Sequence, residues 1–276
     1  MSAIEAALFD LDKTLIDERG CLYPGLAVPL DLAVRPRATT FITGRGYPRY
    51  TQAAEQNPVL WAPGLPVGLE NGGRIVDGTT FENKYFCPLS VDERGLAFDY
   101  LENASDIRFV SFHPRQARAK ATIWPPDTAE AAYMTTAYAR NARVCMGSLA
   151  TLFAAIEAAD PCMITCKTWD APLTHPDPAL HTLQNGTTRN IVPAAAHKGT
   201  AGLIIADMLG LDLQRTLAAG DESADVPLLT LPDLGYPVAV GAHLQRYHRA
   251  ELPPATLYVD HPAHLGALLT DILEVS

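Results

Sequence analysis

The sequence lacks the features that mark secreted, membrane-spanning and disulfide-stabilised proteins. No apolar run approaches the roughly 20 residues that a transmembrane helix needs. The N-terminus has no basic segment followed by an apolar stretch, so we expect no secretion signal and a cytoplasmic protein. The five cysteines are an odd number at irregular spacing, which favours reduced thiols. Cys162 and Cys166 resemble half of a metal site, but no second pair completes it, so buried thiols are favoured.

An excess of basic residues is absent as well. The chain has 21 Lys and Arg against 31 Asp and Glu, and its formal net charge is −10. This balance argues against a nucleic acid or an anionic membrane as partner. It also means that local groups must neutralise any negatively charged substrate. The sequence shows no internal repeat and no low-complexity segment, and its 276 residues are 48% hydrophobic, enough for one large domain or two smaller ones.

A pair of aspartates follows a short apolar run near the N-terminus. Ala6–Phe9 is too short for a helix and is predicted to be a buried strand that ends on Asp10. Asp12 lies two residues further on, so both carboxylates can face the same side at the carboxyl end of the strand. Two neighbouring carboxylates need a shared proton or a cation, and a hard ion such as Mg²⁺ fits oxygen ligands. The plain alternative is a strand end followed by a capped turn.

The roles available to the two aspartates differ. A carboxylate such as that of Asp10 can attack phosphorus and form an aspartyl-phosphate, which divides phosphoryl transfer into two steps. Asp12 can then donate a proton to the leaving alcohol and later accept one from water.

Three more pieces of sequence place polar groups where they can meet a phosphate. The strand-like run 39–42 ends at Thr43-Gly44-Arg45, where a hydroxyl and a backbone N–H can approach a phosphate oxygen. The apolar run 217–219 ends at Gly220-Asp221, and Asp225 follows four residues later. Lys198 precedes a helical pattern over 201–211 and can act as a point charge on a phosphate. Taken alone, Lys198 could equally be a solvated lysine at a helix start.

Together, the four pieces resemble the haloacid dehalogenase (HAD) superfamily of phosphotransferases. The resemblance spans residues 10 to 225 and rests on the ordered set DxDxT, T-G-R, K and GDxxxD, whose matching residues here are Asp10, Asp12, Thr14, Thr43, Lys198, Asp221 and Asp225. It implies an aspartyl-phosphate on Asp10 and Mg²⁺ bound by Asp10, by the main-chain carbonyl of Asp12 and by Asp221. It also implies that Thr43, Gly44 and Lys198 hold the phosphoryl group, while Asp225 belongs to the metal site and supports Lys198 or a metal-bound water.

The chain departs from the family pattern at two positions. Lys13 stands where the family usually has glycine; we expect a negative φ there, so that activity survives. Ala224 stands where many relatives with a similar insert have asparagine, which removes a polar contact near the metal.

The spacing of the motifs predicts an inserted domain. About thirty residues separate Asp10 from Thr43, but more than 150 separate Thr43 from Lys198, far more than one crossover needs. We therefore predict an α/β fold with a Rossmann-like parallel-sheet core at 1–77 plus 193–276 and an α+β cap domain at 78–192. The position of the insert and the ENGG turn at 70–73 resemble the type-2 cap of the HAD superfamily. Further helices are predicted at 47–56, 91–103, 128–141, 149–160 and 265–273, and further strands at 66–69, 107–112, 121–124, 163–168, 189–192, 237–240 and 257–259.

Four residues are candidates for choosing the substrate. Arg45 follows the phosphate loop, and Asn71 lies in the ENGG turn, although an arginine at a helix start and an asparagine in a turn are also ordinary. Lys167 and Arg189 lie on or beside predicted strands of the cap, close to Trp169. An aromatic face with fixed polar groups is a common way to hold a polyol, whereas surface charge on a sheet is the plain alternative.

The sequence thus favours a Mg²⁺-dependent phosphatase of a small phosphorylated metabolite, with a sugar phosphate or sugar-acid phosphate as the favoured class. The nearest alternative is a phosphosugar mutase. A different class, an inactive HAD scaffold that only binds a ligand, has no need of Asp10, Asp12, Lys198 and Asp221 together.

Overall fold

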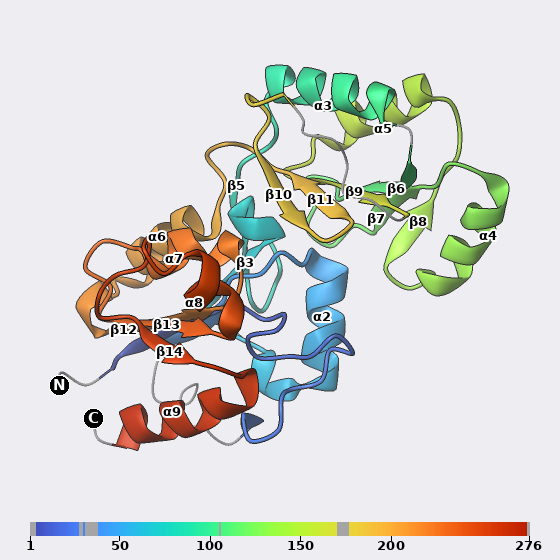
Figure 1. Cartoon of the computed structure of the whole chain (residues 1–276). Coiled ribbons are helices and arrows are strands. Elements are labelled where there is room, and N and C mark those ends of the chain that lie inside the picture. Colours follow the sequence, from blue (N-terminus) through green and yellow to red (C-terminus); the bar gives the residue numbers. More distant parts are fainter. Residues whose placement is uncertain (1–3, 28–29, 31–37, 105, 170–176, 275–276) are drawn as a thin grey trace. The chain divides into compact units, whose positions relative to one another are not determined.

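The computed structural model describes residues 4–27, 30, 38–104, 106–169 and 177–274. These residues form two compact units (Figure 1). The first comprises Met1–Arg45, Tyr50–Lys84 and His197–Ser276, and the second comprises Gly46–Arg49 and Tyr85–Ala196. The assignment of a hydrolase core and a cap domain to them stays a prediction.

The first unit is built on a five-stranded parallel sheet with the order β14–β13–β12–β1–β2 (Figure 1). All residues of its three central strands are buried. Strands buried on both faces consist of continuous apolar runs, which is why short runs identified them in the sequence. The predicted Rossmann-like parallel sheet is therefore confirmed. Its strands are β1 (Ala6–Phe9), β2 (Ala38–Phe41), β12 (Thr216–Gly220), β13 (Tyr236–Val240) and β14 (Leu257–Val259).

A small second sheet adjoins the end of β2. Its strands are β3 (Pro66–Leu69), β4 (Arg74–Asp77) and β5 (Asn83–Phe86), in that order. β3 and β4 form an antiparallel pair joined by a 3₁₀ turn over Glu70–Gly72. β3 meets the chain just beyond β2, where Ile42 bridges to Gly68 and the Thr43 N–H donates to the Gly68 carbonyl at 2.9 Å. The turn after β3 is thereby brought to the carboxyl end of the parallel sheet.

The helix that carries Lys198 begins earlier than the sequence pattern predicts. α6 (Lys198–Leu209) starts three residues before Ala201 because the His197 side chain caps it, accepting a hydrogen bond from the Thr200 N–H at 3.1 Å. This cap places Lys198 at the first helical position. The other helices of this part are α2 (Tyr47–Gln56), whose first residues belong to the second unit, and α7 (Val226–Leu229), α8 (Ala242–Tyr247) and α9 (Pro262–Glu274).

The second unit contains a six-stranded sheet with the order β10–β11–β9–β6–β7–β8. Neighbouring strands are antiparallel except for the parallel pair β7 and β8. The predicted α+β insert is confirmed in its architecture, although β8 and β10 were not predicted. The strands are β6 (Ile107–Phe112), β7 (Ala121–Trp124), β8 (Ala142–Val144), β9 (Ile164–Thr168), β10 (Thr182–Asn185) and β11 (Thr188–Ile191).

Helices cover the two faces of this sheet unequally. α3 (Val91–Asn103) and α5 (Leu149–Ala159) share one apolar core with alternate residues of β6, β9 and β11, including Val110, Cys166 and Ile191. α4 (Thr128–Ala137) packs its Met134 against Phe109 and against residues of β7 and β8 on the other face. The side chains that β9 and β11 present to that other face are Thr165, Lys167, Thr188 and Asn190, all partly exposed.

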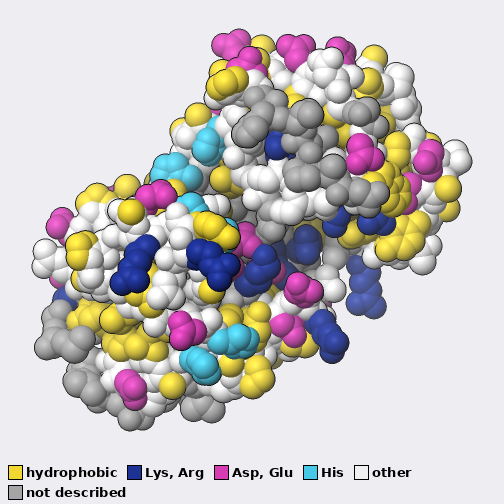
Figure 2. All heavy atoms as spheres, viewed as in Figure 1, with side chains coloured by type: hydrophobic (Ala, Val, Ile, Leu, Met, Phe, Trp, Pro, Cys, Tyr) yellow, Lys and Arg dark blue, Asp and Glu magenta, His cyan; other side chains and the backbone are white. Residues whose placement is uncertain are grey.

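Two properties of the surface bear on the expectations drawn from composition: the hydropathy of the helices and the distribution of charge. Among the described residues, no helix is long and apolar enough to cross a membrane. On the face that Figure 2 shows, acidic and basic side chains are interspersed, so the negative net charge is not gathered there into one acidic patch.

Two helical glycines should respond in opposite ways to alanine. A Cβ on Gly199 of α6 would lie 2.4 Å from the Pro227 carbonyl oxygen, whereas a Cβ on the exposed Gly95 of α3 would meet nothing within 4 Å. We expect Gly199→Ala to lower the free energy of unfolding by about 1–3 kcal/mol. Gly95→Ala should raise it by about 0.5–1 kcal/mol, because glycine weakens a helix interior. Chemical denaturation measures both, and a loss of stability in Gly95→Ala would contradict the placement of that helix.

Candidate active site

Three parallel strands bring the motifs to one edge of the sheet. β1 lies between β2 and β12, and the Asp10 N–H donates to the Ala219 carbonyl at 2.9 Å, while the Ile42 N–H donates to the Phe9 carbonyl at 2.9 Å. The residues that follow these strands therefore gather at the carboxyl edge, where ligands bind in open α/β sheets. Asp10, Thr43 and Asp221 all lie at this edge and are all buried.

Lys198 joins two of the carboxylates. Its Nζ lies 2.6 Å from Asp10 Oδ1 and 2.6 Å from Asp225 Oδ1. Lys198 is 4% exposed and Asp225 is fully buried, so these are charge-assisted contacts in a nearly dry environment. The alternative of a solvated lysine at a helix start does not describe this geometry. Lys198 and Asp225 are thus in direct contact, and the supporting role that the HAD resemblance implies for Asp225 stays a prediction.

Asp225 also fixes the loop that carries Asp221. Its second oxygen, Oδ2, accepts hydrogen bonds from the N–H groups of Asp221 and Glu222, each at 3.0 Å. Both oxygens of Asp225 are therefore already bonded within the protein. This arrangement favours a positioning role for Asp225 over direct coordination of an ion.

Thr14 connects Asp221 to the first motif. Its hydroxyl donates to Asp221 Oδ1 at 2.9 Å and lies 3.4 Å from Asp10 Oδ2, and its side chain is buried. The threonine of the DxDxT motif thus bridges the loop after β1 and the loop after β12.

The buried carboxylates carry more negative charge than the protein neutralises. Burial raises the pKa of Asp10 to about 7, although the Lys198 ammonium opposes this shift. Burial and the charges of Asp10 and Asp225 raise the pKa of Asp221 to about 9. The same two carboxylates, Asp10 and Asp225, raise the pKa of Lys198 above its usual value despite its burial. One ammonium therefore does not offset three carboxylates.

This donor set fits a magnesium ion. Oxygen atoms of Asp10, Asp221 and Asp225 all lie within 4.8 Å of one another. The potential ligands are oxygen atoms only, which a hard cation prefers, and an added positive charge would favour the ionised carboxylates that burial and their mutual repulsion disfavour.

Arg45 binds the second aspartate of the first motif. Its Nε donates to Asp12 Oδ2 at 2.8 Å and its Nη2 donates to Asp12 Oδ1 at 2.5 Å, a two-pronged contact. Asp12 is about half exposed, unlike Asp10. Among the contacts that the structure describes, Arg45 therefore fixes the orientation of the Asp12 carboxylate.

The ENGG turn is hydrogen-bonded to residues 43–45, which follow β2. The Glu70 N–H donates to the Arg45 carbonyl and the Asn71 N–H donates to the Thr43 carbonyl, each at 3.0 Å. The Asn71 amide is buried beside Gly44, where a Cβ would lie 3.0 Å from the Asn71 side-chain oxygen. Glu70 and Asn71 both have φ near +56°, a conformation that costs energy outside glycine. The structure thus brings Asn71 to Thr43 and Gly44.

The expectation for Lys13 is wrong. Its φ is 60°, in the left-handed region, rather than negative. The chain must reverse sharply here, and the Lys13 N–H donates to the Ile16 carbonyl at 2.8 Å across the turn. Glycine adopts this conformation freely, whereas lysine does so at a cost of about 1–2 kcal/mol. The Lys13 side chain forms an ion pair with Glu222.

The two basic candidates of the second unit lie on opposite faces of its sheet. Arg189 is buried on the helix-covered face, where its Nε donates to the Gln184 side chain at 2.6 Å and its Nη1 to the Tyr100 hydroxyl at 3.1 Å. Lys167 is on the other face, because it alternates with Cys166, which belongs to the core under α3 and α5. The predicted grouping of Lys167 with Arg189 is therefore wrong.

Trp169 has a different basic neighbour, which the sequence analysis missed. The Arg108 guanidinium lies 4.8 Å from the centre of the Trp169 ring and 5.6 Å from that of Tyr133, and its Nε donates to Glu130 at 2.8 Å. Both rings are about half exposed. Arg108 has no motif around it, so only the pairing of β6 with β9 could have revealed this cluster. Glu222 lies within the GDxxxD motif, but its role was missed because its partner Lys13 is more than two hundred residues away.

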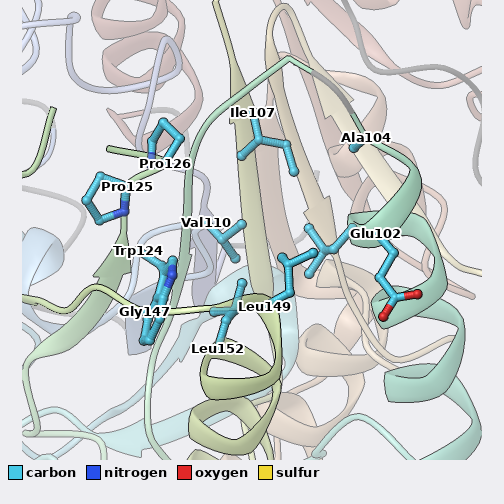
Figure 3. Close-up of a pocket in the computed structure, with 11 residues that line it drawn as sticks. Glu102, Ala104, Ile107, Val110, Trp124, Pro125, Pro126, Gly147, Leu149 and Leu152 are labelled. Atoms are coloured by element: carbon cyan, nitrogen blue, oxygen red, sulfur yellow. The ribbon is translucent and has the colours of Figure 1, made fainter. Parts of the chain in front are cut away.

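The second unit also contains a pocket of about 280 Å³ near the start of α5 (Figure 3). Figure 3 shows apolar side chains around it, with Glu102 as the single charged residue of the lining. Such a lining offers no group for a phosphate, and we assign it no role. The labelled residues include Ile107, Val110, Trp124, Leu149 and Leu152.

Comparison with known proteins supports the motif assignment. A family model of haloacid dehalogenase-like hydrolases matches residues 179–246, which include Lys198, Asp221 and Asp225. No curated protein matches the sequence.

Solved structures match the chain over almost its whole length. A sugar phosphatase of HAD subclass IIB has a TM-score of 0.71 at 14% identity, covering 98% of this chain and 98% of that chain. A haloacid dehalogenase-like hydrolase from Bacteroides thetaiotaomicron has a TM-score of 0.73 at 13% identity, covering 99% and 100%. A HAD/Cof-like hydrolase from Plasmodium vivax has a TM-score of 0.74 at 14% identity, covering 99% and 96%.

At such identities the likeness establishes the fold. In fold over nearly its whole length, and in sequence over residues 179–246, the chain therefore resembles the haloacid dehalogenase-like hydrolases that its four motifs indicate.

Proposed function

We propose that this chain is a Mg²⁺-dependent phosphomonoesterase that acts on a small phosphorylated metabolite through an aspartyl-phosphate. One observation carries the proposal: Lys198 lies between the buried carboxylates of Asp10 and Asp225 at the carboxyl edge of a parallel sheet. A buried ammonium held at a nucleophile is suited to a dianionic substrate. The fold shared with a sugar phosphatase supports a sugar phosphate or sugar-acid phosphate as the substrate, and the absence of membrane-length helices among the described residues is compatible with a cytoplasmic enzyme.

Asp10 is the nucleophile in this proposal. Its Oδ1 is bonded to Lys198, and an oxygen of the same carboxylate attacks phosphorus. A bond forms between that oxygen and phosphorus while the bond from phosphorus to the leaving alcohol oxygen breaks. Lys198 offsets the charge on the phosphoryl oxygens, and Thr43 and Gly44 contact them through a hydroxyl and a backbone N–H.

Asp12 carries the proton in both steps. In the first it donates a proton to the departing alcohol oxygen, and in the second it accepts one from the water that attacks the aspartyl-phosphate. That attack breaks the bond between Asp10 and phosphorus and restores the carboxylate. Arg45 holds Asp12 by both oxygens and so orients it for this transfer.

The acidic cluster is where Mg²⁺ would bind. Asp10, Asp221 and the main-chain carbonyl of Asp12 are the proposed ligands, and Asp225 supports Lys198 and the Asp221 loop. The ion supplies electrostatic stabilisation of the charge on the phosphoryl group. Ala224 offers no polar group here, so orientation of the substrate depends on other residues.

We further propose that residues 78–192 form a type-2 cap that selects the substrate, and that 1–77 with 193–276 form the hydrolase core. Lys167, Arg45 and Asn71 remain the proposed contacts to the substrate, and Arg108 with Trp169 joins them as a mixed aromatic and cationic surface. Arg189 stabilises the packing of α3 instead. A phosphosugar mutase remains the alternative within the same chemistry, and it would yield an isomerised sugar phosphate rather than free phosphate.

Replacing the nucleophile should abolish turnover. We expect Asp10→Asn to reduce the release of phosphate from a small activated phosphoester by more than about a thousandfold, because an amide is a poor nucleophile and a poor metal ligand. Circular dichroism should report an unchanged fold. Asp207→Asn, an exposed change at the far end of α6, is the matched control and should keep full activity. Undiminished phosphate release by Asp10→Asn would exclude the aspartyl-phosphate mechanism.

Removing the metal should abolish activity, and adding it should stabilise the fold. Mg²⁺ at a hundred times its dissociation constant should raise the free energy of unfolding by about 2.7 kcal/mol. Thermal unfolding should show this shift in the native chain and in Asp207→Asn, and a much smaller one in Asp221→Asn. Full activity after exhaustive chelation, or an equal shift in Asp221→Asn, would refute the assignment of the ion to this cluster.

The two basic candidates of the second unit, Lys167 and Arg189, should separate specificity from stability. We expect Lys167→Met to change the ratio of kcat/KM values between phosphorylated metabolites in a panel by about tenfold. The reason is that one charged contact contributes at least about 1.4 kcal/mol. Its thermal stability should stay unchanged. Arg189→Lys should instead lower the free energy of unfolding by about 1–3 kcal/mol, because lysine cannot bond both Gln184 and Tyr100 in the same geometry. If Lys167→Met lowers stability while Arg189→Lys changes substrate preference, the roles proposed for the two residues are wrong.

A further inference from the structure

Two neighbouring residues after β1 pair with two neighbouring residues after β12. Thr14 donates to Asp221 at 2.9 Å in a buried hydrogen bond. Beside it, Lys13 forms an ion pair with Glu222, in which the lysine and glutamate side chains are 46% and 29% exposed. The contacts thus form an inner hydrogen bond and an outer ion pair between the same two loops.

Each of the two loops is closed by its own internal hydrogen bonds. In the loop after β1, the Lys13 N–H donates to the Ile16 carbonyl and the Leu15 N–H donates to the Leu11 carbonyl, each at 2.8 Å. The loop after β12 is closed by Asp225, which accepts from two successive N–H groups. Each loop is therefore held internally, and the two contacts between the loops add to the pairing of β1 with β12 in setting how Asp221 lies relative to Asp10.

Lysine is an unfavourable choice at position 13 for the backbone alone. The φ of 60° would suit glycine without cost, so the lysine is present despite a conformational penalty. What lysine adds is a side chain that reaches Glu222, which neighbours Asp221. Any advantage of lysine over glycine at position 13 must therefore come from its contact with Glu222 or from its positive charge.

We propose that Lys13 and Glu222 are a positioning pair that fastens the Asp221 loop to the Asp10 loop and so sets the affinity of the acidic cluster for a divalent cation. Neither side chain contacts the reacting atoms in this proposal. It rests on the proposed function only in taking Asp10 and Asp221 as ligands of that cation. Partners outside the ligand shell commonly change metal affinity by 10- to 100-fold when they are removed.

The experiment titrates Mg²⁺ into the full chain by isothermal calorimetry and measures the melting temperature of each metal-free variant. Lys13→Met and Glu222→Gln should each weaken Mg²⁺ binding by about tenfold. The double variant should be no weaker than either single variant, because both changes remove one contact. The exchanged pair, Lys13→Glu with Glu222→Lys, should recover part of the affinity.

Lys13→Gly separates positioning from stability. This variant removes the backbone penalty together with the tether, so its melting temperature should not fall, whereas its Mg²⁺ affinity should still be about tenfold weaker. If Lys13→Met lowers the melting temperature but leaves the Mg²⁺ affinity unchanged, the pair only stabilises the fold. That result would overturn the proposal.

Two further results also overturn it. If Lys13→Met raises the KM of phosphoesters while Glu222→Gln does not, Lys13 acts on the substrate rather than through Glu222. If the effects of the two single changes on Mg²⁺ affinity add in the double variant, the residues do not act as a pair. A native chain that binds Mg²⁺ but hydrolyses no phosphoester would refute the proposed function alone, because the calorimetric comparison still tests the tether.

Discussion

The structure of the site depends on one ammonium group held between two buried carboxylates. Lys198, Asp10 and Asp225 come from the start of α6, the end of β1 and the loop after β12. Burying any one of these charges alone would be costly, and removing one partner leaves another uncompensated. The three segments therefore stabilise one another only when all are in place. Asp225 extends this dependence to the backbone, because it also accepts the N–H groups that shape the Asp221 loop.

The sequence was a good guide to the fold for a physical reason. The central strands are buried on both faces, so β1 and β12 are unbroken apolar runs, and α2, α3 and β14 have the predicted bounds. Strands that were missed, such as β5 and β10, are short and partly exposed, and their sequences carry no apolar run. β4 was also missed, although it is mostly buried, because it follows the ENGG turn directly.

The positions of site residues were predictable where these residues directly follow strands. They were less predictable where the position depends on side-chain contacts or on strand register. Asp10, Thr43 and Asp221 follow from the parallel order of β2, β1 and β12. The face to which Arg189 points depends on the register of β11, which a single sequence does not reveal, and a shift of one residue reverses it. The positive φ of Lys13 was missed because the expectation was drawn from the residue type, whereas the tightness of the turn determined the conformation.

The strand order also determines when the central strand can be completed during synthesis. Ala6 of β1 pairs with Thr216 of β12, so a ribosome must add most of the chain before one edge of β1 finds its partner. Until then that edge is exposed and can pair wrongly, which is the usual hazard of non-local parallel strands. The second unit lies almost entirely within the contiguous stretch Tyr85–Ala196 and can complete its own sheet earlier. The nascent chain is thus expected to contain a folded second unit while the sheet of the first unit is still incomplete.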